Sequence, residues 1–558
     1  MPVVIVDGKE VEIGAARLNG IQAARLVGVE IPHYCWHPGL SVVASCRMCL
    51  VEAGKRDSAT GKVTMQPRLV PACQTPAGPD TVFVTNSEKV RDARAMVEED
   101  LLLRHPVDCP ICDKAGECSL QDYHFEHGRD QRRADIQPFT SRRRELGDTV
   151  TLFVDRCVMC TRCVRFTREI SGTSELMVIN RGADEEIDVF RDASGQIQFP
   201  LENKLSGNVV DLCPVGALGD KDFLYKQRVW FMKSHAGVCA NCSTGCSIHV
   251  EENQDRVYRL KPRENPHVNQ WWMCDEGRYG WNHVHDPSRV AQLAKRDGKR
   301  HVVMEWSQLP VELDTKLLKA GRLAAVISPH LTVEEAYLLC TYLRGVDPQA
   351  VLAVGPIPRE GTDEKFPSGF TIRAEKCPNR KGVEAVVSRL GGGLLNWGDF
   401  LGQVESGAFG GVWVTGGYRQ PWNDAEVAAK FDGVKLLVVQ DCFASPLWDR
   451  ADYQLPGATF AEREGSYVNA TDRLQSFDWA IRPPAGVMVE GRLYWQLLGR
   501  PGLYRAKEVM QEIAREIITF STAAGDVPNV GVDLKVTQLA GSETRGSGLG
   551  TEGRSPSG

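Results

Sequence analysis

Four cysteines in the middle of the chain have the type and spacing that bind an inorganic cluster. Cys157, Cys160 and Cys163 follow one another at intervals of three residues, and Cys213 stands directly before Pro214. Three thiolates this close together can hold one face of a [4Fe–4S] cubane, and a distant cysteine can complete the set. The chain has 18 cysteines. Because no export signal is evident, tight groups of this kind indicate metal ligands rather than disulfides.

The spacing of this group resembles a bacterial two-cluster ferredoxin that has kept one of its clusters. In such a ferredoxin the motif C-x2-C-x2-C-x3-C-P occurs twice, and the fourth cysteine of each motif binds the other cluster. The positions that would hold the second cluster are occupied here by Thr167, Asn203, Ser206 and Val209. The pattern therefore predicts a ferredoxin-like module over residues 147–230, with one [4Fe–4S] cluster bound by Cys157, Cys160, Cys163 and Cys213.

A second group of cysteines lies near the N-terminus and comprises Cys35, Cys46, Cys49 and Cys73. It follows a predicted hairpin at residues 3–13, in which Asp7-Gly8 joins two β-rich runs. The arrangement resembles a plant-type ferredoxin with a longer first loop, so it predicts a [2Fe–2S] cluster beside a small β-grasp sheet over residues 1–84. A four-cysteine zinc site is the alternative, which the long loop and the hairpin disfavour.

Three further cysteines, Cys109, Cys112 and Cys118, leave a four-coordinate site one ligand short. They follow a predicted helix that opens at a capping box, Thr85-Asn-Ser-Glu88, with Val90, Ala93, Val97 and Leu101 on its apolar face. By spacing, His105 is the best candidate for the fourth ligand, since imidazole is a cluster ligand in other centres. His105 could instead be a core histidine, with the fourth ligand absent or supplied by Asp108, Asp113, His124 or His127.

The sequence from His105 to Cys118, with Leu120-Gln-Asp122 just beyond, resembles a segment of the large iron–sulfur subunit family of respiratory complex I. The segments Ile31–Pro38 and Ser45–Glu52 resemble the [2Fe–2S] loop of the same family, and the resemblance runs from residue 1 to about 285. In that family one histidine and three cysteines hold a [4Fe–4S] cluster. The resemblance therefore implies that His105, Cys109, Cys112 and Cys118 bind such a cluster in a domain over residues 85–146.

A fourth cysteine group, Cys239, Cys242, Cys246 and Cys274, is similar to the [4Fe–4S] motif that opens molybdopterin oxidoreductases. We expect a third [4Fe–4S] cluster there, in a domain over residues 231–290. Members of the complex I family vary at this motif, and some lack these cysteines. A zinc ribbon is the alternative for a four-cysteine set.

Beyond residue 290 short apolar runs alternate with helical stretches. The runs are 323–327, 351–354, 411–415 and 435–440, and Thr332 caps a helix that ends at Gly345. This alternation predicts a doubly wound parallel sheet over residues 291–540. The segments 451–456, 460–469 and 473–475 resemble a molybdopterin oxidoreductase domain. The chain as a whole is thus expected to be a multidomain α+β and α/β protein, with a disordered Gly- and Ser-rich tail at 541–558.

Three cysteines lie outside the four groups. Cys340 and Cys442 are expected in the core, because Cys340 shares the apolar face of its helix and Cys442 follows an apolar strand. Cys377 lies at a distance from Cys274 at which molybdenum enzymes of the resembled family can carry a metal ligand. Only residues 378–558 follow it, which is too short a stretch to enclose two pterin cofactors. We therefore expect no molybdopterin.

The remaining features point to electron transfer rather than to an active site. The net charge of −6 indicates no nucleic-acid partner. No apolar run approaches the ~18 residues of a membrane span, and the N-terminus lacks the pattern of a signal or transit peptide, so we expect a cytosolic chain. No strand is followed by a dinucleotide or P-loop fingerprint, so no catalytic residue is assigned, and NADH and flavin are expected on a partner.

The resemblance implies an electron-relay subunit of complex I at the cytoplasmic side of the bacterial inner membrane. Its partners would be the flavin-bearing NADH-oxidising subunit, a small [2Fe–2S] subunit and the subunits that lead to quinone. Two alternatives stay open. An iron-only hydrogenase or NAD-linked formate dehydrogenase subunit shares the N-terminal modules but usually keeps both ferredoxin clusters. A zinc-stabilised scaffold without enzymatic activity could use the same cysteines.

Overall fold

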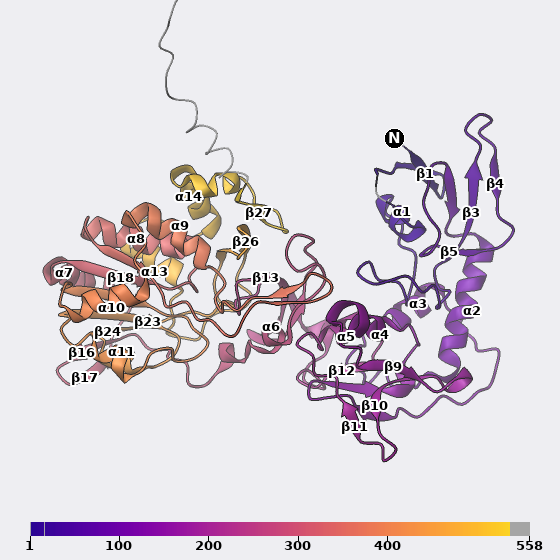
Figure 1. Cartoon of the computed structure of the whole chain (residues 1–558), viewed down its shortest axis with the longest axis horizontal. Helices are drawn as coiled ribbons and strands as arrows, with labels where there is room; N and C mark the ends of the chain where they lie inside the picture. The colour runs from indigo at the N-terminus through magenta and orange to yellow at the C-terminus, as the bar shows by residue number, and fades with distance from the viewer. Residues whose placement is uncertain (1, 16, 536–558) are drawn as a thin grey trace, which may run out of the picture. The chain divides into compact units, whose positions relative to one another are not determined.

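The structure of the chain is a computed structural model that describes residues 2–15 and 17–535. The expected tail at 541–558 lies outside the described residues. The chain divides into two compact units (Figure 1). The N-terminal unit consists of Met1–Met232 with Phe366–Phe370, and the C-terminal unit consists of Lys233–Lys365 with Thr371–Gly558. Among the described residues, no helix combines the length and apolar character needed to cross a bilayer.

The N-terminal unit begins with the predicted hairpin, which is confirmed. Asp7 and Gly8 both have positive φ angles, 47° and 79°, as the tight turn between β1 and β2 requires. Parallel pairing of β1 with β6 completes a β-grasp sheet in the order β2-β1-β6-β3-β4, with β5 paired to β3. The elements are β1 Val3–Val6, β2 Lys9–Glu12, α1 Gly20–Leu26, β3 Leu50–Arg56, β4 Val63–Met65, β5 Val70–Pro71 and β6 Thr81–Val84.

The predicted helix after this sheet is confirmed as α2 Glu88–Arg104, but its predicted cap is wrong. Ser87, not Thr85, is the N-cap and accepts a hydrogen bond from the Val90 N–H at 3.4 Å. The Thr85 N–H instead donates to the Asp7 carboxylate at 2.7 Å, which ties the strand end to the first hairpin. A second helix, α3 Ser119–His127, packs against α2.

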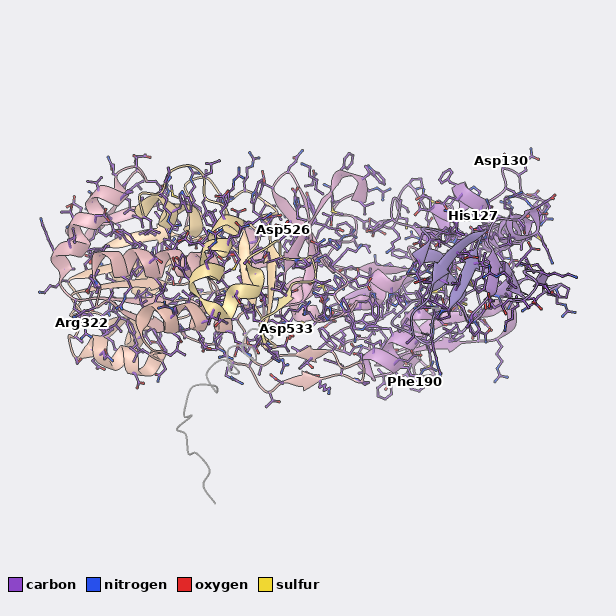
Figure 2. All side chains as sticks on the ribbon, turned by 90° about the horizontal axis from the view of Figure 1, so that it is seen from above. His127, Asp130, Phe190, Arg322, Asp526 and Asp533 are labelled. Atoms are coloured by element: carbon purple, nitrogen blue, oxygen red, sulfur yellow. The ribbon has the colours of Figure 1, made fainter. Side chains whose placement is uncertain are left out.

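The ferredoxin-like module consists of short elements around two small sheets. The sheets have the strand orders β12-β8-β7 and β11-β10-β9. Phe190 on β10 is 46% exposed and packs on Phe199 of β11 with ring centroids 5.7 Å apart (Figure 2). The elements are β7 Arg143–Glu145, β8 Val150–Phe153, η1 Val154–Arg156, α4 Arg162–Phe166, η2 Thr167–Ser171, β9 Leu176–Ile179, η3 Gly182–Asp184, β10 Glu186–Arg191, β11 Ile197–Phe199, α5 Asn208–Leu212, β12 Leu218–Asp220 and η4 Val229–Phe231.

The C-terminal unit opens with an antiparallel three-stranded sheet. Strand β14 lies in its middle, paired with β13 on one side and β15 on the other. The elements of this region are β13 Lys233–Val238, β14 Ser247–Asn253, β15 Arg256–Pro262, α6 Asp275–Tyr279 and η5 Asn282–His285.

A seven-stranded sheet, in the order β17-β16-β24-β23-β22-β18-β19, forms the rest of the unit. Its five strands from β24 to β19 are parallel, which confirms the predicted doubly wound sheet, whereas the antiparallel hairpin β16–β17 at one edge was not predicted. The strands are β16 Ala294–Asp297, β17 Arg300–Val303, β18 Leu323–Ile327, β19 Val351–Val354, β22 Gly411–Thr415, β23 Leu436–Asp441 and β24 Tyr453–Pro456.

Helices cover both faces of this sheet because its strands alternate between two apolar cores. Val438 belongs to the core under α7, α8, α9, α13 and α14, whereas the adjacent Val439 belongs to the core under α10, α11 and α12. Cys340 and Cys442 are buried, as predicted. The helices are α7 Leu309–Ala320, α8 Val333–Val346, α9 Arg380–Gly391, α10 Trp397–Glu405, α11 Ala425–Ala429, α12 Pro446–Arg450, α13 Glu490–Leu497 and α14 Ala506–Glu516. The remaining elements are β20 Glu364–Lys365, β21 Thr371–Ile372, β25 Gly465–Val468, β26 Arg473–Phe477, η6 Ile518–Ala523 and β27 Val532–Asp533.

Candidate iron–sulfur centres

The first donor set, called the [2Fe–2S] set, consists of Cys35, Cys46, Cys49 and Cys73. Cys49 directly precedes β3, and Cys73 follows β5, so the pairing of these two strands brings both residues together. Thiol hydrogen bonds link Cys35 to Cys46 and Cys73, and Cys49 to Cys73, and they lower the pKa values of Cys35 and Cys49. Three of the four cysteines are about 1% exposed. Converging, buried thiols are a donor set that suits a [2Fe–2S] cluster.

The second donor set, the His105 set, lies where α2 ends. His105 is the extended residue that follows Arg104, and Pro106 prevents the helix from continuing. Cys118 is the N-cap residue of α3, Cys112 is buried and Cys109 is exposed. Burial, assisted by the charge of Arg156, lowers the pKa of His105 and so favours the neutral imidazole that can bind metal.

The carboxylates that were considered as alternatives to His105 are engaged elsewhere. Arg156 donates to Asp108 at 2.8 Å, and its guanidinium lies 4.0 Å from the centroid of the Phe153 ring. Asp113 accepts a hydrogen bond from the Tyr225 N–H at 2.8 Å. These contacts favour His105 over either carboxylate as the fourth ligand.

Arg228 holds the backbone of the same loop. Its guanidinium donates to the carbonyl oxygens of Cys112, Cys109 and Pro110 at 2.8, 3.1 and 2.7 Å. The loop also needs a glycine opposite it, because a Cβ atom at Gly216 would lie 2.1 Å from Cys112 Sγ. Gly216 closely follows Cys213, so the His105 set and the next set share a boundary.

The third donor set, the Cys157 set, lines a cavity whose other walls are mainly apolar. Cys160 and Cys163, from α4 and the turn before it, meet Cys213 at the end of α5. Burial raises the pKa of Cys160 to about 11, so the thiolates are stabilised only by a cationic centre. The cavity residues are Cys157, Cys160, Cys163 and Cys213 with Leu152, Val158, Thr161, Arg162, Ile187, Val215, Ala217 and Leu218.

Packed side chains occupy most of the positions that would hold a second ferredoxin cluster. Thr167, Ser206 and Val209 are each at most 1% exposed. The Thr167 hydroxyl donates to the Val164 carbonyl at 3.1 Å, and the hydroxyls of Ser206 and Thr149 lie 2.9 Å apart. These contacts agree with the loss of that cluster.

The fourth donor set, the Cys239 set, consists of Cys239, Cys242, Cys246 and Cys274, which are each 4–5% exposed. Its loop is fixed to the C-terminal domain, because the Gln475 side chain donates to the Gly245 carbonyl at 2.7 Å. Glycine is also required at position 277, where a Cβ atom would lie 3.2 Å from Cys239 Sγ. Burial raises the pKa of Cys239 to about 12, which again calls for a cationic centre.

Among the described residues, no three His, Cys, Asp or Glu side chains are arranged to hold a single metal ion. A single zinc ion needs donors within about 2.0–2.3 Å of one point. The iron atoms of a cubane hold four thiolates around a larger core. Donor type, burial and loop shape are therefore the features on which the four sets fit iron–sulfur clusters.

The carboxyl edge of the parallel sheet is where doubly wound folds bind ligands. Here buried side chains occupy it. The Asp441 carboxylate accepts hydrogen bonds from the Gly417 N–H at 2.9 Å and the Trp422 indole at 2.7 Å. His330 and Tyr418 stack edge-on, with ring centroids 4.7 Å apart. These side chains do not fit a large pterin at this edge, and Cys377 is fully buried.

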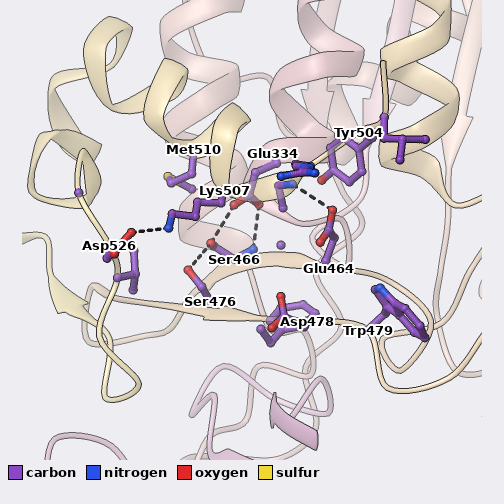
Figure 3. Close-up of a pocket in the computed structure, with 17 residues that line it drawn as sticks. Glu334, Glu464, Ser466, Ser476, Asp478, Trp479, Tyr504, Lys507, Met510 and Asp526 are labelled. Carbon is purple, nitrogen blue, oxygen red and sulfur yellow. Dashed lines mark hydrogen bonds and ion pairs between the residues drawn. The ribbon is translucent and has the colours of Figure 1, made fainter. Parts of the chain in front are cut away.

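A separate pocket of about 610 Å³ lies in the C-terminal unit (Figure 3). Glu334, at the start of α8, accepts hydrogen bonds from the Ser466 N–H and hydroxyl, both at 2.8 Å. Burial raises the pKa of Glu334 to about 7. Lys507 and Asp526 form an ion pair of 2.5 Å elsewhere in the lining. None of the lining residues belongs to the four donor sets, so this pocket is separate from the cluster chemistry.

Sequence reasoning missed the charged residues that support the cluster loops. Arg94 and Glu98 are buried on α2, and the Tyr34 hydroxyl donates to Glu98 at 2.5 Å beside the [2Fe–2S] set. Arg165 is 1% exposed on α4. The available signal was position, since Arg162 and Arg165 flank the ligand Cys163 in the sequence.

Five protein-family models match successive parts of the chain. They describe a 2Fe-2S iron-sulfur cluster binding domain at 4–78, an NADH-ubiquinone oxidoreductase-G iron-sulfur binding region at 94–133, and the ferredoxin-like domain of NADH-quinone oxidoreductase subunit 3 at 147–219. A molybdopterin oxidoreductase Fe4S4 domain matches 232–286, and a molybdopterin oxidoreductase domain matches 399–491. These matches confirm the predicted types of domain in their predicted order.

Curated relatives match the same part of the chain. A subunit of the NADH-quinone oxidoreductase of Rickettsia felis is 32% identical, over 61% of this chain and 48% of the relative. The NADH-ubiquinone oxidoreductase 75 kDa subunit of Reclinomonas americana is 36% identical, over 54% of this chain and 41% of the relative. Iron-sulfur protein 1 of mitochondrial NADH dehydrogenase from Solanum tuberosum is 37% identical, over 50% and 35%.

The chain therefore spans about half the length of the first of these relatives. Among solved structures, a chain of an NAD+-reducing [NiFe]-hydrogenase in the H2-reduced state is 27% identical with a TM-score of 0.34, covering 41% of this chain and 91% of that one. By its successive family domains and its curated relatives, the chain is related to the large iron–sulfur subunit of NADH-quinone oxidoreductase.

Proposed function

We propose that the chain is the electron-relay subunit of an NADH-quinone oxidoreductase. It passes single electrons from a flavin-bearing NADH-oxidising partner, through iron–sulfur clusters, toward the subunits that reduce quinone. Iron–sulfur clusters, when bound, accept and release one electron at a time. The observation that carries the proposal is that three donor sets share one compact unit and have loops in mutual contact.

Those contacts join each pair of sets in the N-terminal unit. The position of Gly216 against Cys112 Sγ brings the Cys157 set beside the His105 set. The Tyr123 hydroxyl, on the helix that follows Cys118, accepts a hydrogen bond from the His33 N–H at 3.2 Å, next to the [2Fe–2S] set. A chain built in this way favours relay over catalysis at one centre.

The proposed cofactors are one [2Fe–2S] cluster and three [4Fe–4S] clusters, without molybdopterin. The proposed partners are the flavin-bearing subunit, a small [2Fe–2S] subunit and the quinone-module subunits. The proposed location is the cytoplasmic face of the bacterial inner membrane, which the chain reaches through the complex. The proposed ligands are Cys35, Cys46, Cys49 and Cys73; His105, Cys109, Cys112 and Cys118; Cys157, Cys160, Cys163 and Cys213; and Cys239, Cys242, Cys246 and Cys274.

Metal and sulfide analysis of the anaerobically purified chain tests the cofactor content. The four clusters sum to about fourteen irons per chain. Low-temperature EPR of the reduced protein should show one signal that survives at higher temperature and several that relax fast. Stoichiometric zinc in place of iron and sulfide would overturn the proposal, and molybdenum or tungsten near one per chain, lost in Cys377→Ala, would overturn the absence of molybdopterin.

Substitution at His105 tests the unusual ligand. His105→Cys should keep a cluster of lower potential, because thiolate donates more charge than neutral imidazole. His105→Ala should weaken or lose this one cluster, whereas the other three persist. Unchanged spectra and midpoint potentials in both variants would assign the fourth ligand to another residue.

Partner assays test the relay itself. The flavin-free chain should not bind NADH tightly in calorimetry, since no dinucleotide fingerprint follows a strand. In its native host the chain should co-purify with a flavoprotein in a membrane-associated assembly. Hydrogen evolution or formate oxidation by the pure chain would instead support the hydrogenase or formate dehydrogenase alternative.

A further inference from the structure

One buried arginine connects two of the donor sets. Arg165 lies on α4, two residues beyond the ligand Cys163, and is 1% exposed. Its Nη2 donates to the carbonyl of Cys35 at 2.5 Å and to the carbonyl of Cys160 at 3.1 Å. Its Nη1 donates to the carbonyl of Ser41, in the loop between Cys35 and Cys46, at 2.5 Å. A single guanidinium therefore holds ligand residues of the [2Fe–2S] set and the Cys157 set.

Arg162, one turn earlier, makes a parallel connection. Its Nη2 donates to the carbonyl of Trp36 at 2.6 Å, and its Nη1 donates to the carbonyl of Leu212 at 3.2 Å. Trp36 follows Cys35, and Leu212 precedes Cys213. The short helix that carries Cys163 thus ties the [2Fe–2S] loop to both arms of the Cys157 set.

The charge of Arg165 has no carboxylate partner within ion-pair distance among the described residues. Its printed partners are neutral carbonyl oxygens, and the nearby groups that favour its charged form are, in order, Cys160, Cys35 and Glu169. A buried, unpaired charge costs several kcal/mol. Thiolates of two clusters would supply the missing negative charge.

Both arginines also have a spare donor. The Nε atoms of Arg162 and Arg165 are buried and have no hydrogen-bond partner. Buried polar groups without a partner are rare in folded proteins and call for an explanation. A sulfur-rich cluster next to each side chain is an acceptor that would satisfy them.

We propose that Arg165 is a positioning residue shared by the [2Fe–2S] and Cys157-set clusters. It fixes the separation of the two clusters through the carbonyls of Cys35 and Cys160. Its buried charge also favours the reduced, more negative state of both, and so raises both midpoint potentials. The inference rests on the proposed function, because it requires that both sets hold clusters.

The test is an EPR-monitored redox titration of the full chain in three variants. Arg165→Met removes the charge and the donors but keeps much of the side-chain length. Arg228→Met is the matched control, because Arg228 also donates to three carbonyls but only within the His105 set. Arg168→Met, at a side chain that is 62% exposed, controls for loss of a surface charge.

We expect Arg165→Met to lower the midpoint potentials of the [2Fe–2S] and Cys157-set clusters together. The spin–spin broadening between these two reduced clusters should also change, since it depends on their separation. Arg228→Met should shift only the His105-set signal, and Arg168→Met should shift none. Loss of both the [2Fe–2S] and Cys157-set clusters in Arg165→Met, with the others retained, would equally support a shared role.

Arg165→Lys separates charge from position. Lysine keeps the positive charge but lacks the planar fork that reaches two carbonyls. We expect potentials closer to those of the unchanged chain, together with a several-fold faster loss of iron to a chelator from these two sites. A shift confined to one cluster, an equal shift of all four, or no shift in Arg165→Met would overturn the inference. If the unchanged chain holds no clusters, the proposed function fails before this inference is reached.

Discussion

The two units satisfy their buried backbone groups in different ways. In the N-terminal unit, irregular loops carry the ligands, and side chains such as Arg228 and Arg165 donate to loop carbonyls. In the C-terminal unit, the ladders of a seven-stranded sheet pair the backbone, and two apolar cores cover the sheet. Every buried carbonyl needs a donor. The loops therefore depend on individual arginines and on bound clusters, whereas the sheet depends on its own pairing.

Removal of the clusters should have the largest effect, and it should fall on one unit. Without iron and sulfide, the thiols of the [2Fe–2S], His105 and Cys157 sets lose their common centre, and metal-stabilised loops lose structure with their metal. Hydrogen exchange by mass spectrometry should rise strongly over residues 105–118 and 157–163 and stay slow in β18, β22 and β23. Equal exchange in both units, with or without iron, would contradict this contrast.

A large core residue of the sheet domain should show the reverse pattern. Leu338 on α8 is fully buried in the core that covers one face of the sheet. Leu338→Ala should lower the free energy of unfolding of the C-terminal unit by about 2–5 kcal/mol, through lost burial and a cavity. Thermal denaturation measures this loss, while the EPR signals of the three N-terminal sets should stay unchanged. Altered N-terminal signals would mean that the two units do not respond independently.

The sequence predicted the sheet domain well because its signal is local. The ranges of β18, β19 and β22 agree with the predicted runs, and Thr332 caps α8 as expected. Continuous apolar runs between turn signals indicate strands buried on both faces. The hairpin β16–β17 was missed because its residues, such as Arg296, are mostly polar. Its pairing with β24 is a long-range contact that no local pattern shows.

The cluster loops were predictable in their ligands but not in their supports. Cysteine spacing is a strong signal because it follows from the size of the cluster. The burial of α2 was misjudged: Arg94 and Glu98 are buried, whereas Val97 of the predicted apolar face is only half-buried. Their burial arises from partners distant in sequence, such as Tyr34. A periodicity argument cannot see such partners, because it assumes that a buried helix face is apolar.

The buried carboxylate of the pocket should make the C-terminal unit sensitive to pH. Burial raises the pKa of Glu334 from 4.5 to about 7, so the folded state binds a proton that the unfolded state releases. This contribution to stability is present at low pH and is lost as the pH rises from about 4.5 to about 7. Glu334→Gln should remove it, and the variant should gain up to about 3 kcal/mol over the unchanged chain at pH 8.

Thermal denaturation of both chains at pH 5 and pH 8 checks this expectation. Asp441 and Glu490 also have raised pKa values, about 6 and about 7, so the unchanged chain keeps other pH-dependent contributions. The difference between the two chains isolates Glu334. Ser466→Ala removes one hydrogen-bond donor to this carboxylate without removing the acid, and it should keep the pH dependence. A difference between Glu334→Gln and the unchanged chain that does not vary with pH would contradict the assignment.

The smallest effects should come from one matched change made in each unit. Asn19 caps α1 in the N-terminal unit, where its side chain accepts from the Gln22 N–H at 3.0 Å. Asn396 caps α10 in the C-terminal unit, where it accepts from the Asp399 N–H at 2.9 Å. Replacing either asparagine by alanine removes one cap and should cost about 1 kcal/mol. The chemistry is the same, so a difference in outcome reflects the unit that carries the cap.

Asn396→Ala should lower the unfolding midpoint of the C-terminal unit whether or not iron is bound, since α10 packs on the sheet. Asn19→Ala should have its full effect on the cluster-free chain and a smaller one on the loaded chain. Core contacts join α1 to Cys49 and Cys73, so a bound [2Fe–2S] cluster restrains the same region. Ligands that bind only the folded state raise its stability and oppose local opening. Calorimetry of both variants with and without iron measures the four midpoints, and equal losses for Asn19→Ala in both states would show that the cluster does not stabilise α1.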